Sequence, residues 1–317
     1  MPMDVDTHLA LSLDQPAPAE ANGHSNKDVL AALNTPGDAI YHPCPEADPG
    51  LAVPRGEVLQ FEDWQETEIY AHTKRNLYIY RTPGFDPERP SKLICCNDGV
   101  AYVMKRGAVR APLVMDALHA SGELEQAVGI FINPGSPPPD LPPVPSHNYD
   151  EAATQRCEEY DSVTPVYGDF LLQEVVPFAE AQLGTSLSNS PDQRIACGIS
   201  SGGICAFTTA WFHTEAFGNV LSHCGSFTNI RGGHNYPYLI RTTPRKPLRA
   251  LLTSGENDAG TLFGDWPLAN KAMANALAYA GYEHRFEFGT GGHNLRHGGA
   301  IFADSLRWLW QLPSPAT

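Results

Sequence analysis

The sequence has little positive charge and no long apolar run. Its 317 residues include 21 Lys and Arg against 36 Asp and Glu, which gives a formal net charge of -15 at pH 7. A chain with this net charge repels a polyanion, and the sequence contains no run of basic residues. We therefore expect no nucleic-acid partner. No apolar run reaches the 18 residues that a transmembrane helix needs, so we expect no membrane partner either.

The start of the chain lacks the features of a secretory signal. It is acidic rather than basic, and its only apolar patch runs from Leu9 to Leu13, which predicts a cytoplasmic protein. The seven cysteines are odd in number and contain no CxxC pair, so a disulfide framework is not expected. Residues 1–28 are rich in Ala, Pro, Asp, Asn and Ser. We predict a disordered or loosely packed extension there, followed by a single domain over 29–317.

Motifs for cofactors are also missing. The chain has no P-loop, no GxGxxG and no HExxH. His293 and His297 have i,i+4 spacing, but they lie in a glycine-rich segment rather than in a predicted helix. We therefore expect neither a cofactor nor a bound metal.

Apolar runs of strand length alternate with helical patterns through most of the chain. Residues 56–69 and 75–81 contain strand-like stretches that predict an antiparallel pair at a sheet edge. The alternation beyond them predicts a mostly parallel sheet with helices on both faces. Functional residues then belong beyond the carboxyl ends of the strands. The predicted strands are 92–96, 127–132, 194–197, 220–224, 248–253 and 285–288, and the predicted helices are 109–119, 167–183, 201–212, 266–280 and 300–310.

One segment between a predicted strand and a predicted helix carries the motif G-x-S-x-G. It reads Gly198-Ile-Ser200-Ser-Gly202. A sharp strand-to-helix turn leaves no room for side chains two residues on either side of the serine, so glycine fits both positions. The turn exposes the Ser200 hydroxyl and brings the backbone N–H of Ser201 to a helix N-terminus, where an oxyanion is stabilised. We predict that Ser200 is a nucleophile.

A serine nucleophile needs a base, and in the α/β-hydrolase fold the chain order is Ser, acid, His. Asp258 follows the strand 248–253 and is the predicted acid, with Glu256 as the alternative. His293 lies in a glycine-rich segment before the last helix and is the predicted base, with His297 as the alternative. A second oxyanion donor is expected after the strand 92–96, at the N–H of Gly99 or Val100.

These motifs together resemble the esterase D and enterochelin-esterase-like branch of the α/β hydrolases, which includes feruloyl and acetyl-xylan esterases. The resemblance covers about residues 55–312. It rests on Asn97-Asp-Gly99, Arg156-Cys-Glu-Glu-Tyr160, Gly198-Ile-Ser-Ser-Gly202-Gly, Gly255-Glu-Asn-Asp258 and Gly291-Gly-His293. It implies that the Arg156–Tyr160 stretch helps to build the floor of the site; local packing and a salt bridge are the alternative. The residues expected at the substrate are Asp98, Glu159, Tyr160 and Trp266.

The expected activity is hydrolysis of a carboxylic ester through an acyl-enzyme. The partner is then a small-molecule ester, of which a siderophore lactone, a hydroxycinnamoyl ester and an acylated sugar are the candidates. Two alternatives stay open: an acyltransferase that passes the acyl group to an alcohol, and a catalytically silent binding protein. Residues 134–147 and 226–240 are the segments expected to shape the substrate site. The sequence indicates no oligomeric state.

Overall fold

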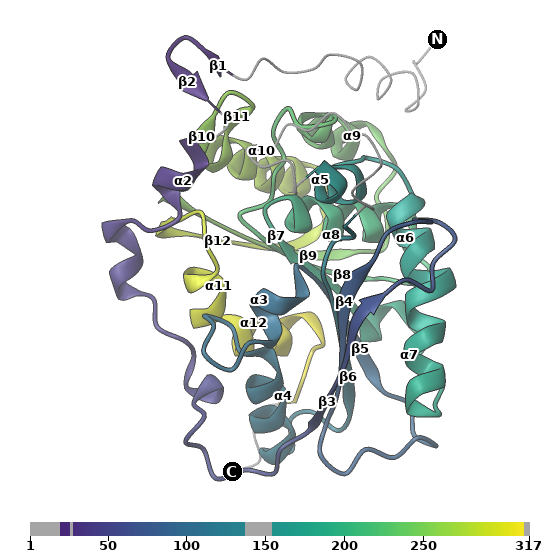
Figure 1. Ribbon diagram of the computed structural model, residues 1–317. Helices are drawn as coiled ribbons and strands as arrows, with labels where there is room; N and C mark the ends of the chain where they lie inside the picture. The colour runs from purple at the N-terminus through teal and green to yellow at the C-terminus, as the bar shows by residue number, and fades with distance from the viewer. Residues whose placement is uncertain (1–19, 26–27, 137–153, 314–317) are drawn as a thin grey trace.

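An eight-stranded sheet forms the centre of the molecule (Figure 1). The structure is a computed structural model that describes residues 20–25, 28–136 and 154–313. The strand order is β12-β9-β8-β7-β5-β6-β4-β3; the first six run parallel, and β4 and β3 are antiparallel at one edge. The strands are β3 (Glu57–Trp64), β4 (Arg75–Arg81), β5 (Lys92–Asn97), β6 (Ala127–Ile132), β7 (Arg194–Ile199), β8 (Asn219–His223), β9 (Arg249–Asn257) and β12 (Glu283–Gly292).

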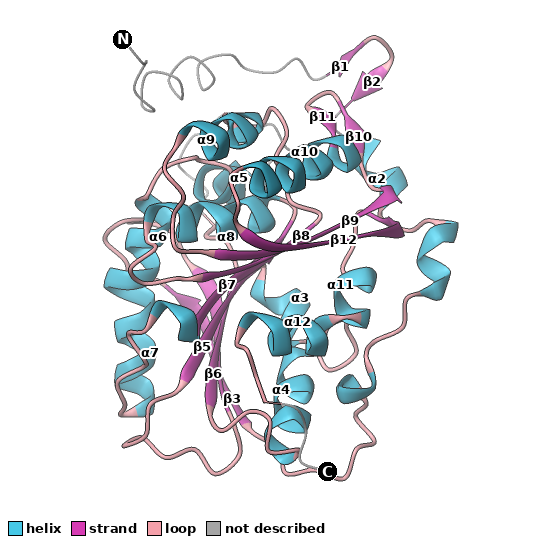
Figure 2. Cartoon of the chain, turned by 180° about the vertical axis from the view of Figure 1, so that it is seen from behind, coloured by secondary structure: helices cyan, strands magenta, loops and turns pink. Residues whose placement is uncertain are grey.

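Helices cover both faces of this sheet, as the two opposite views show (Figure 2). The helices α4 and α12 pack on one face, and α7, α8 and α10 pack on the other. The predicted α/β-hydrolase architecture and the antiparallel edge pair are therefore confirmed. The helices are α2 (Val29–Ala32), α3 (Gly99–Val103), α4 (Ala111–Ala120), α5 (Thr154–Tyr160), α6 (Val166–Phe170), α7 (Val176–Leu183), α8 (Ser201–Phe212), α9 (Tyr236–Thr242), α10 (Trp266–Tyr279), α11 (Arg296–Ala300) and α12 (Phe302–Leu309).

Alternating side chains of the strands feed two separate apolar cores. In β5, Leu93 and Cys95 belong to the core under α7, α8 and α10, whereas Ile94 and Cys96 belong to the core under α4 and α12. Successive side chains of a strand point to opposite faces, so a strand that is buried on both faces is a continuous apolar run. This explains why the central strands were recognisable from the sequence.

The elements around the site differ from the sequence prediction at their ends. The strand β9 continues to Asn257 and β12 to Gly292, beyond the apolar runs that mark their buried parts. Their glycine-rich ends pair through the backbone, with Gly289 opposite Gly255. The helices α3 and α9 are five and seven residues long and were not predicted, because such short helices show no clear periodicity.

Three other expectations concern the chain as a whole. All seven cysteines lie among the described residues and are buried, and none forms a disulfide. No helix within the described ranges is long and apolar enough to cross a bilayer. The predicted extension lies mostly outside the described residues, so its boundary at residue 28 stays a prediction.

Candidate active site

The carboxyl ends of four parallel strands lie on the same side of the sheet, and each strand is followed by a residue that the sequence marked as functional. Asp98 follows β5, Ser200 follows β7, Asp258 follows β9 and His293 follows β12. The carboxyl ends of parallel strands lie on one side of a sheet. Residues that are up to 195 positions apart in the chain, from Asp98 to His293, are thereby brought to one rim.

Ser200 sits at a sharp bend between β7 and α8. Its backbone has φ 58° and ψ -122°, a conformation that costs a non-glycine residue free energy and is held by the surrounding structure. A Cβ on Gly198 would lie 2.1 Å from Gly202 O, so a side chain at position 198 cannot be accommodated. The bend is fixed by the β8 strand next to it, since Ser200 N donates to His223 O at 2.9 Å.

Three side chains form a continuous hydrogen-bonded row at this rim. His293 Nε2 lies 2.8 Å from Ser200 Oγ, and His293 Nδ1 lies 2.6 Å from Asp258 Oδ1. The remaining acceptors of Asp258 are also satisfied, by Ser254 Oγ–H at 2.6 Å and Ala259 N–H at 2.8 Å. His293 and Asp258 are both buried, so the imidazole is held between the hydroxyl and the carboxylate with little access to water.

The two rival residues lie elsewhere. Glu256 is exposed within β9, while Asp258, two residues on, makes the contact with the imidazole. The ring of His297 stacks on that of Tyr41 with centroids 4.4 Å apart. The structure therefore brings His293 and Asp258, and not His297 and Glu256, to Ser200.

Two helices begin at the rim of the sheet where Ser200 lies. Ser201 is the first residue of α8 and Gly99 is the first residue of α3, so the amide of each has no intrahelical acceptor. The amide of Val100 already donates to Asn133 Oδ1 at 2.9 Å. Val100 would have to exchange that partner for a substrate oxygen, whereas Gly99 needs no such exchange within its helix.

Three of the residues expected at the substrate, Asp98, Glu159 and Tyr160, are held by contacts within the protein. Arg156 binds Asp98 with two hydrogen bonds, Nε to Oδ1 at 2.8 Å and Nη2 to Oδ2 at 2.7 Å. Glu159 is fully buried in an ion pair with Arg75 at 2.7 Å. Tyr160 is fully buried, and its hydroxyl accepts from Asp98 N and donates to Ile132 O. The Arg156–Tyr160 stretch thus makes local packing contacts and salt bridges, and its role in the floor of the site stays a prediction.

Trp266 and two residues that no sequence motif indicated complete the surroundings of the triad. The Trp266 ring meets the His293 ring edge-on at 5.6 Å, and its Nε1–H donates to Ser226 Oγ at 3.3 Å. Ser226 Oγ is 3.2 Å from Ser200 Oγ. Ser226 is the first residue of the segment 226–240 that was expected to shape the substrate site, but no motif singled it out. Ser254, the partner of Asp258, likewise had no signal apart from its place at the end of a buried run.

One group of side chains in the described ranges has the composition of a metal site. Atoms of Cys224, Asp258 and His293 lie within 4.8 Å of one another. Burial, with the nearby charge of Asp258, holds the pKa of the Cys224 thiol well above its usual value. A neutral thiol is a poor metal ligand, and both ring nitrogens of His293 already face Ser200 and Asp258. The arrangement suits hydrogen bonding rather than metal ligation.

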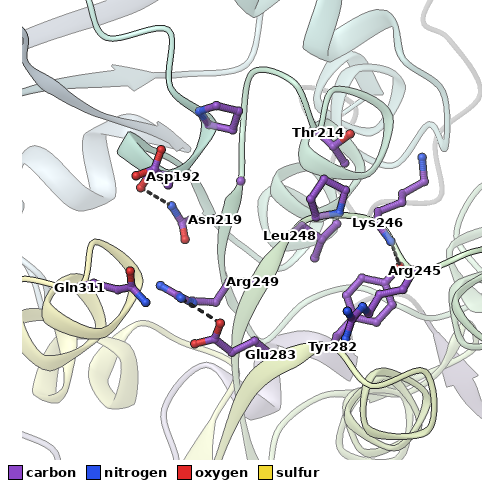
Figure 3. A pocket seen from close by; sticks show the side chains of 13 residues that line it. Asp192, Thr214, Asn219, Arg245, Lys246, Leu248, Arg249, Tyr282, Glu283 and Gln311 are labelled. Atoms are coloured by element: carbon purple, nitrogen blue, oxygen red, sulfur yellow. Dashed lines mark hydrogen bonds and ion pairs between the residues drawn. The ribbon is translucent and has the colours of Figure 1, made fainter.

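A pocket of about 480 Å³ lies at the amino ends of the parallel strands, opposite the rim that carries Ser200 (Figure 3). Asn219, Arg249 and Glu283 line it, and these are the first residues of β8, β9 and β12. Arg249 binds Glu283 at 2.8 Å across it. Because Ser200 follows the other end of its strand, this pocket is not part of the site. Of the two expected substrate-shaping segments, 137–147 falls outside the described residues, and 226–240 contains the start of α9.

The parallel sheet, the bend at Ser200 and the order of the three side chains define an α/β hydrolase. A family model described as "Putative esterase" matches residues 70–308, and the chain belongs to this family.

Relatives and solved structures agree with this assignment. The chain is 26% identical over 300 residues to the iron(III) enterobactin esterase of Dickeya dadantii, with 89% of this chain and 62% of that protein covered. It superposes on the enterobactin esterase of Shigella flexneri with TM-score 0.61 at 19% identity, covering 88% of this chain and 63% of that one. A ferulic acid esterase from Anaeromyces mucronatus gives TM-score 0.59 at 16% identity, with 82% and 92% covered. The chain thus spans less than two thirds of the enterobactin esterases it matches.

Proposed function

We propose that this chain is a serine esterase that hydrolyses a carboxylic ester through an acyl-enzyme on Ser200. The observation that carries the proposal is the row of hydrogen bonds from Asp258 through His293 to Ser200, with lengths of 2.6 and 2.8 Å. Membership of the esterase family supports the same reaction class. A serine hydroxyl is a weak nucleophile on its own, and this row supplies the base that activates it.

In the first half-reaction, Ser200 Oγ attacks the carbonyl carbon of the ester while His293 Nε2 takes the hydroxyl proton. The carbonyl π electrons move to the oxygen, and the N–H of Ser201 with that of Gly99 or Val100 binds the resulting oxyanion. Asp258 accepts the Nδ1–H of His293 and stabilises the positive imidazolium. When the carbonyl re-forms, the C–O bond to the alcohol breaks, and the imidazolium returns its proton to the departing oxygen.

In the second half-reaction, water takes the place of the alcohol. His293 Nε2 accepts a proton as the water oxygen adds to the acyl carbon, and the same amides hold the second oxyanion. The bond to Ser200 Oγ then breaks, Oγ regains its proton from the imidazolium, and the free acid leaves. The order alcohol first, acid second is the signature of this two-step scheme.

The substrate class follows from the relatives rather than from a described cavity. The similar proteins are named as enterobactin esterases and a ferulic acid esterase, and one enterobactin esterase was crystallised in the presence of 2,3-dihydroxy-N-benzoyl-serine, which carries an aromatic ring. We therefore propose a siderophore lactone or a hydroxycinnamoyl ester as the substrate, ahead of an acylated sugar. Trp266, which is buried edge-on against His293, is proposed as an aromatic wall behind the imidazole.

The test is release of p-nitrophenol from its acetate and butyrate esters. We expect Ser200→Ala to lower kcat by about 10⁴-fold or more and His293→Ala to lower it nearly as much. The matched control is His297→Ala, four residues along the same segment, which should lower kcat far less than His293→Ala because its ring stacks on Tyr41 and is not the hydrogen-bond partner of Ser200.

Three outcomes would count against the proposal in different ways. If His297→Ala were inactive and His293→Ala active, the base would be His297 rather than His293. An added alcohol that captures most of the acyl group, in preference to water, would make the protein an acyltransferase. No nitrophenol release together with no labelling of Ser200 by a fluorophosphonate would leave a silent binding protein.

A further inference from the structure

A segment near the start of the described chain lies against the loop that carries His293. We call residues 32–41 the brace; they comprise the end of α2, a linking turn and a short 3-10 helix, Pro36–Ile40. The segment opposite it is 289–294, at the end of β12. More than 245 residues of chain separate the two segments, and the family match begins only at residue 70.

Hydrogen bonds from the brace reach the residues on either side of His293 as well as its own amide. His293 N donates to Ala32 O at 2.7 Å. Gly292 N donates to Asp38 Oδ1 at 2.9 Å. Asn294 Nδ2 donates to Leu33 O at 3.2 Å. Three consecutive residues of the loop are thus tied to the brace.

A second set of contacts joins the brace to Thr290, which lies in β12 and precedes His293. The amide of Thr290 donates to Tyr41 Oη at 3.0 Å, and its hydroxyl donates to Gly37 O at 2.9 Å. The two backbones approach so closely that a Cβ on Gly37 would lie 1.9 Å from Thr290 O. A Cβ on Gly292 would lie 2.2 Å from Ala32 O. Glycine is therefore required at positions 37 and 292 for the brace to pack against the 289–294 segment.

Asp38 is the one ionised side chain in this contact, and it is fully buried. Its Oδ2 accepts from Thr35 N at 2.7 Å and from Thr35 Oγ at 3.1 Å, while its Oδ1 accepts from Gly292 N. Burial alone would raise the pKa of Asp38, but the hydrogen bonds from Gly292, Thr35 and Asn294 outweigh it, and the pKa is lowered. A buried charge satisfied in this way is fixed in one geometry.

We propose that the brace positions the imidazole of His293, and that Asp38 is a positioning residue which holds the Gly291–Gly292 peptide, next to His293, for catalysis. The proposal rests on the proposed role of His293 as the base. Asp258 fixes the ring from one side, but the ring can reach Ser200 only if its own backbone is in the right place. The brace supplies that backbone constraint from outside the segment that the family match covers.

The test compares variants of Asp38 with a neighbour that leaves the key contact intact. Asp38→Ala removes the acceptor for Gly292 N, and we expect kcat to fall about 10- to 100-fold, since misplacing a catalytic group by about 1 Å has effects of this size. KM should change by less than about threefold, because the substrate does not touch Asp38. Thr35→Ala removes only a hydroxyl bond to Oδ2 and should keep kcat within about twofold.

Two further variants guard against a simple loss of folding. Asp38→Asn keeps a carbonyl oxygen for Gly292 N but sets an NH₂ against Thr35 N, so kcat should be intermediate between wild type and Asp38→Ala. Gly37→Ala pushes the brace away from Thr290 O without touching Asp38 and should lower kcat as Asp38→Ala does. If Asp38→Ala does not fold, these two carry the test.

A readout that does not depend on ester hydrolysis separates this proposal from the proposed function. The proton between His293 Nδ1 and Asp258 should give a low-field NMR signal, assigned by its loss in His293→Ala. We expect the signal to shift or broaden by exchange in Asp38→Ala and in Gly37→Ala, and to stay unchanged in Thr35→Ala.

The proposal is overturned if Asp38→Ala keeps both the signal and the wild-type kcat, or if Thr35→Ala loses as much kcat as Asp38→Ala. If wild type releases no nitrophenol, the proposed function fails, and the NMR comparison still decides whether the brace holds the imidazole.

Discussion

His223 is a buried histidine whose uncharged imidazole contributes to the stability of the folded protein. The side chain is fully buried at the end of β8, and its Nδ1 lies 3.1 Å from Thr253 Oγ. A Cβ on Gly298 would lie 2.5 Å from Nδ1, so the ring is closely packed. Burial, reinforced by the neighbouring His297, lowers the pKa of His223 to about 3. The folded protein therefore holds this ring uncharged above about pH 3.

The pH dependence of stability follows from this lowered pKa. In the unfolded chain the imidazole takes up a proton below about pH 6.5, and in the folded chain only near pH 3. The unfolded state thus binds more protons in that window, so the contribution of His223 is complete above pH 6.5 and is lost as the pH falls. By pH 4.5, two pH units below the unfolded pKa, the loss should be about 3 kcal/mol.

Thermal unfolding of wild type and His223→Asn between pH 7.5 and 4 checks this. The melting temperature of the variant should fall less steeply than that of wild type. Asp161 acts in the opposite direction, since burial raises its pKa to about 6, but it is present in both proteins and cancels in the difference. Parallel curves would show that His223 does not titrate in this way.

At the scale of single residues, the sequence indicated the three side chains of the proposed triad and missed the residues that contact the His293 segment. Ser200, Asp258 and His293 are each flanked by glycines or turn residues just after a strand, and this local pattern is enough to select them. Asp38 and Ala32 have no such pattern. Their partners lie more than 250 residues along the chain, so only the folded structure shows their contact with the His293 loop.

Between elements, a buried ion pair joins the antiparallel edge of the sheet to α5. Arg75 on β4 donates to Glu159 from Nη1 at 2.7 Å and from Nη2 at 3.0 Å, and both side chains are fully buried. Gln155 and Gly135 N also donate to Glu159, and the guanidinium lies 4.6 Å from the centre of the Phe170 ring. The pair fixes how α5, and with it Arg156 and Asp98, sits beside the active-site rim.

Breaking this pair should destabilise the protein strongly. Glu159→Gln leaves the Arg75 guanidinium charged and buried, and we expect the free energy of unfolding to fall by about 3 to 5 kcal/mol. The double variant Arg75→Met/Glu159→Leu removes both charges and should recover most of that loss. Urea unfolding followed by tryptophan fluorescence measures all of these proteins.

A second ion pair serves as the control. Arg89 and Glu125 are 3.5 Å apart, with side chains 57% and 83% exposed. Glu125→Gln should therefore change the free energy of unfolding by less than about 1 kcal/mol. A Glu159→Gln variant no less stable than Glu125→Gln would contradict the structural role given to the buried pair.

Strands were predictable from the sequence where both faces are buried, because burial leaves an apolar run. Strand ends that are held only by backbone pairing were not predictable. The central strands were found because their apolar runs face two cores. The ends of β9 and β12 contain Gly255 and Gly289, whose pairing leaves no trace in hydrophobicity. These unrecognised ends matter for the proposed site, because they carry Asp258 and His293 past the core to the rim.

Over the whole molecule, charge is unevenly distributed. The chain carries a formal net charge of -15, yet one pocket of about 330 Å³ is lined by Arg106, Arg110 and Arg296 as well as His42. Asp38 also lines this pocket, but both of its oxygens are already bonded to Thr35 and Gly292. The long-range field of the protein is therefore negative, while the field beside the brace is locally positive.

Ionic strength should reveal which of these fields an approaching ester experiences. If the net charge dominates, a negatively charged ester such as p-nitrophenyl hemisuccinate is repelled at low salt, and screening relieves the repulsion as the Debye length falls to about 10 Å at 0.1 M. We expect kcat/KM for this ester to rise about two- to threefold between 20 and 200 mM NaCl. For the neutral p-nitrophenyl butyrate it should stay constant, which controls for effects of salt on the enzyme itself. A decrease for the anionic ester would mean that Arg106, Arg110 and Arg296 govern its approach, and Arg296→Gln should then abolish the decrease.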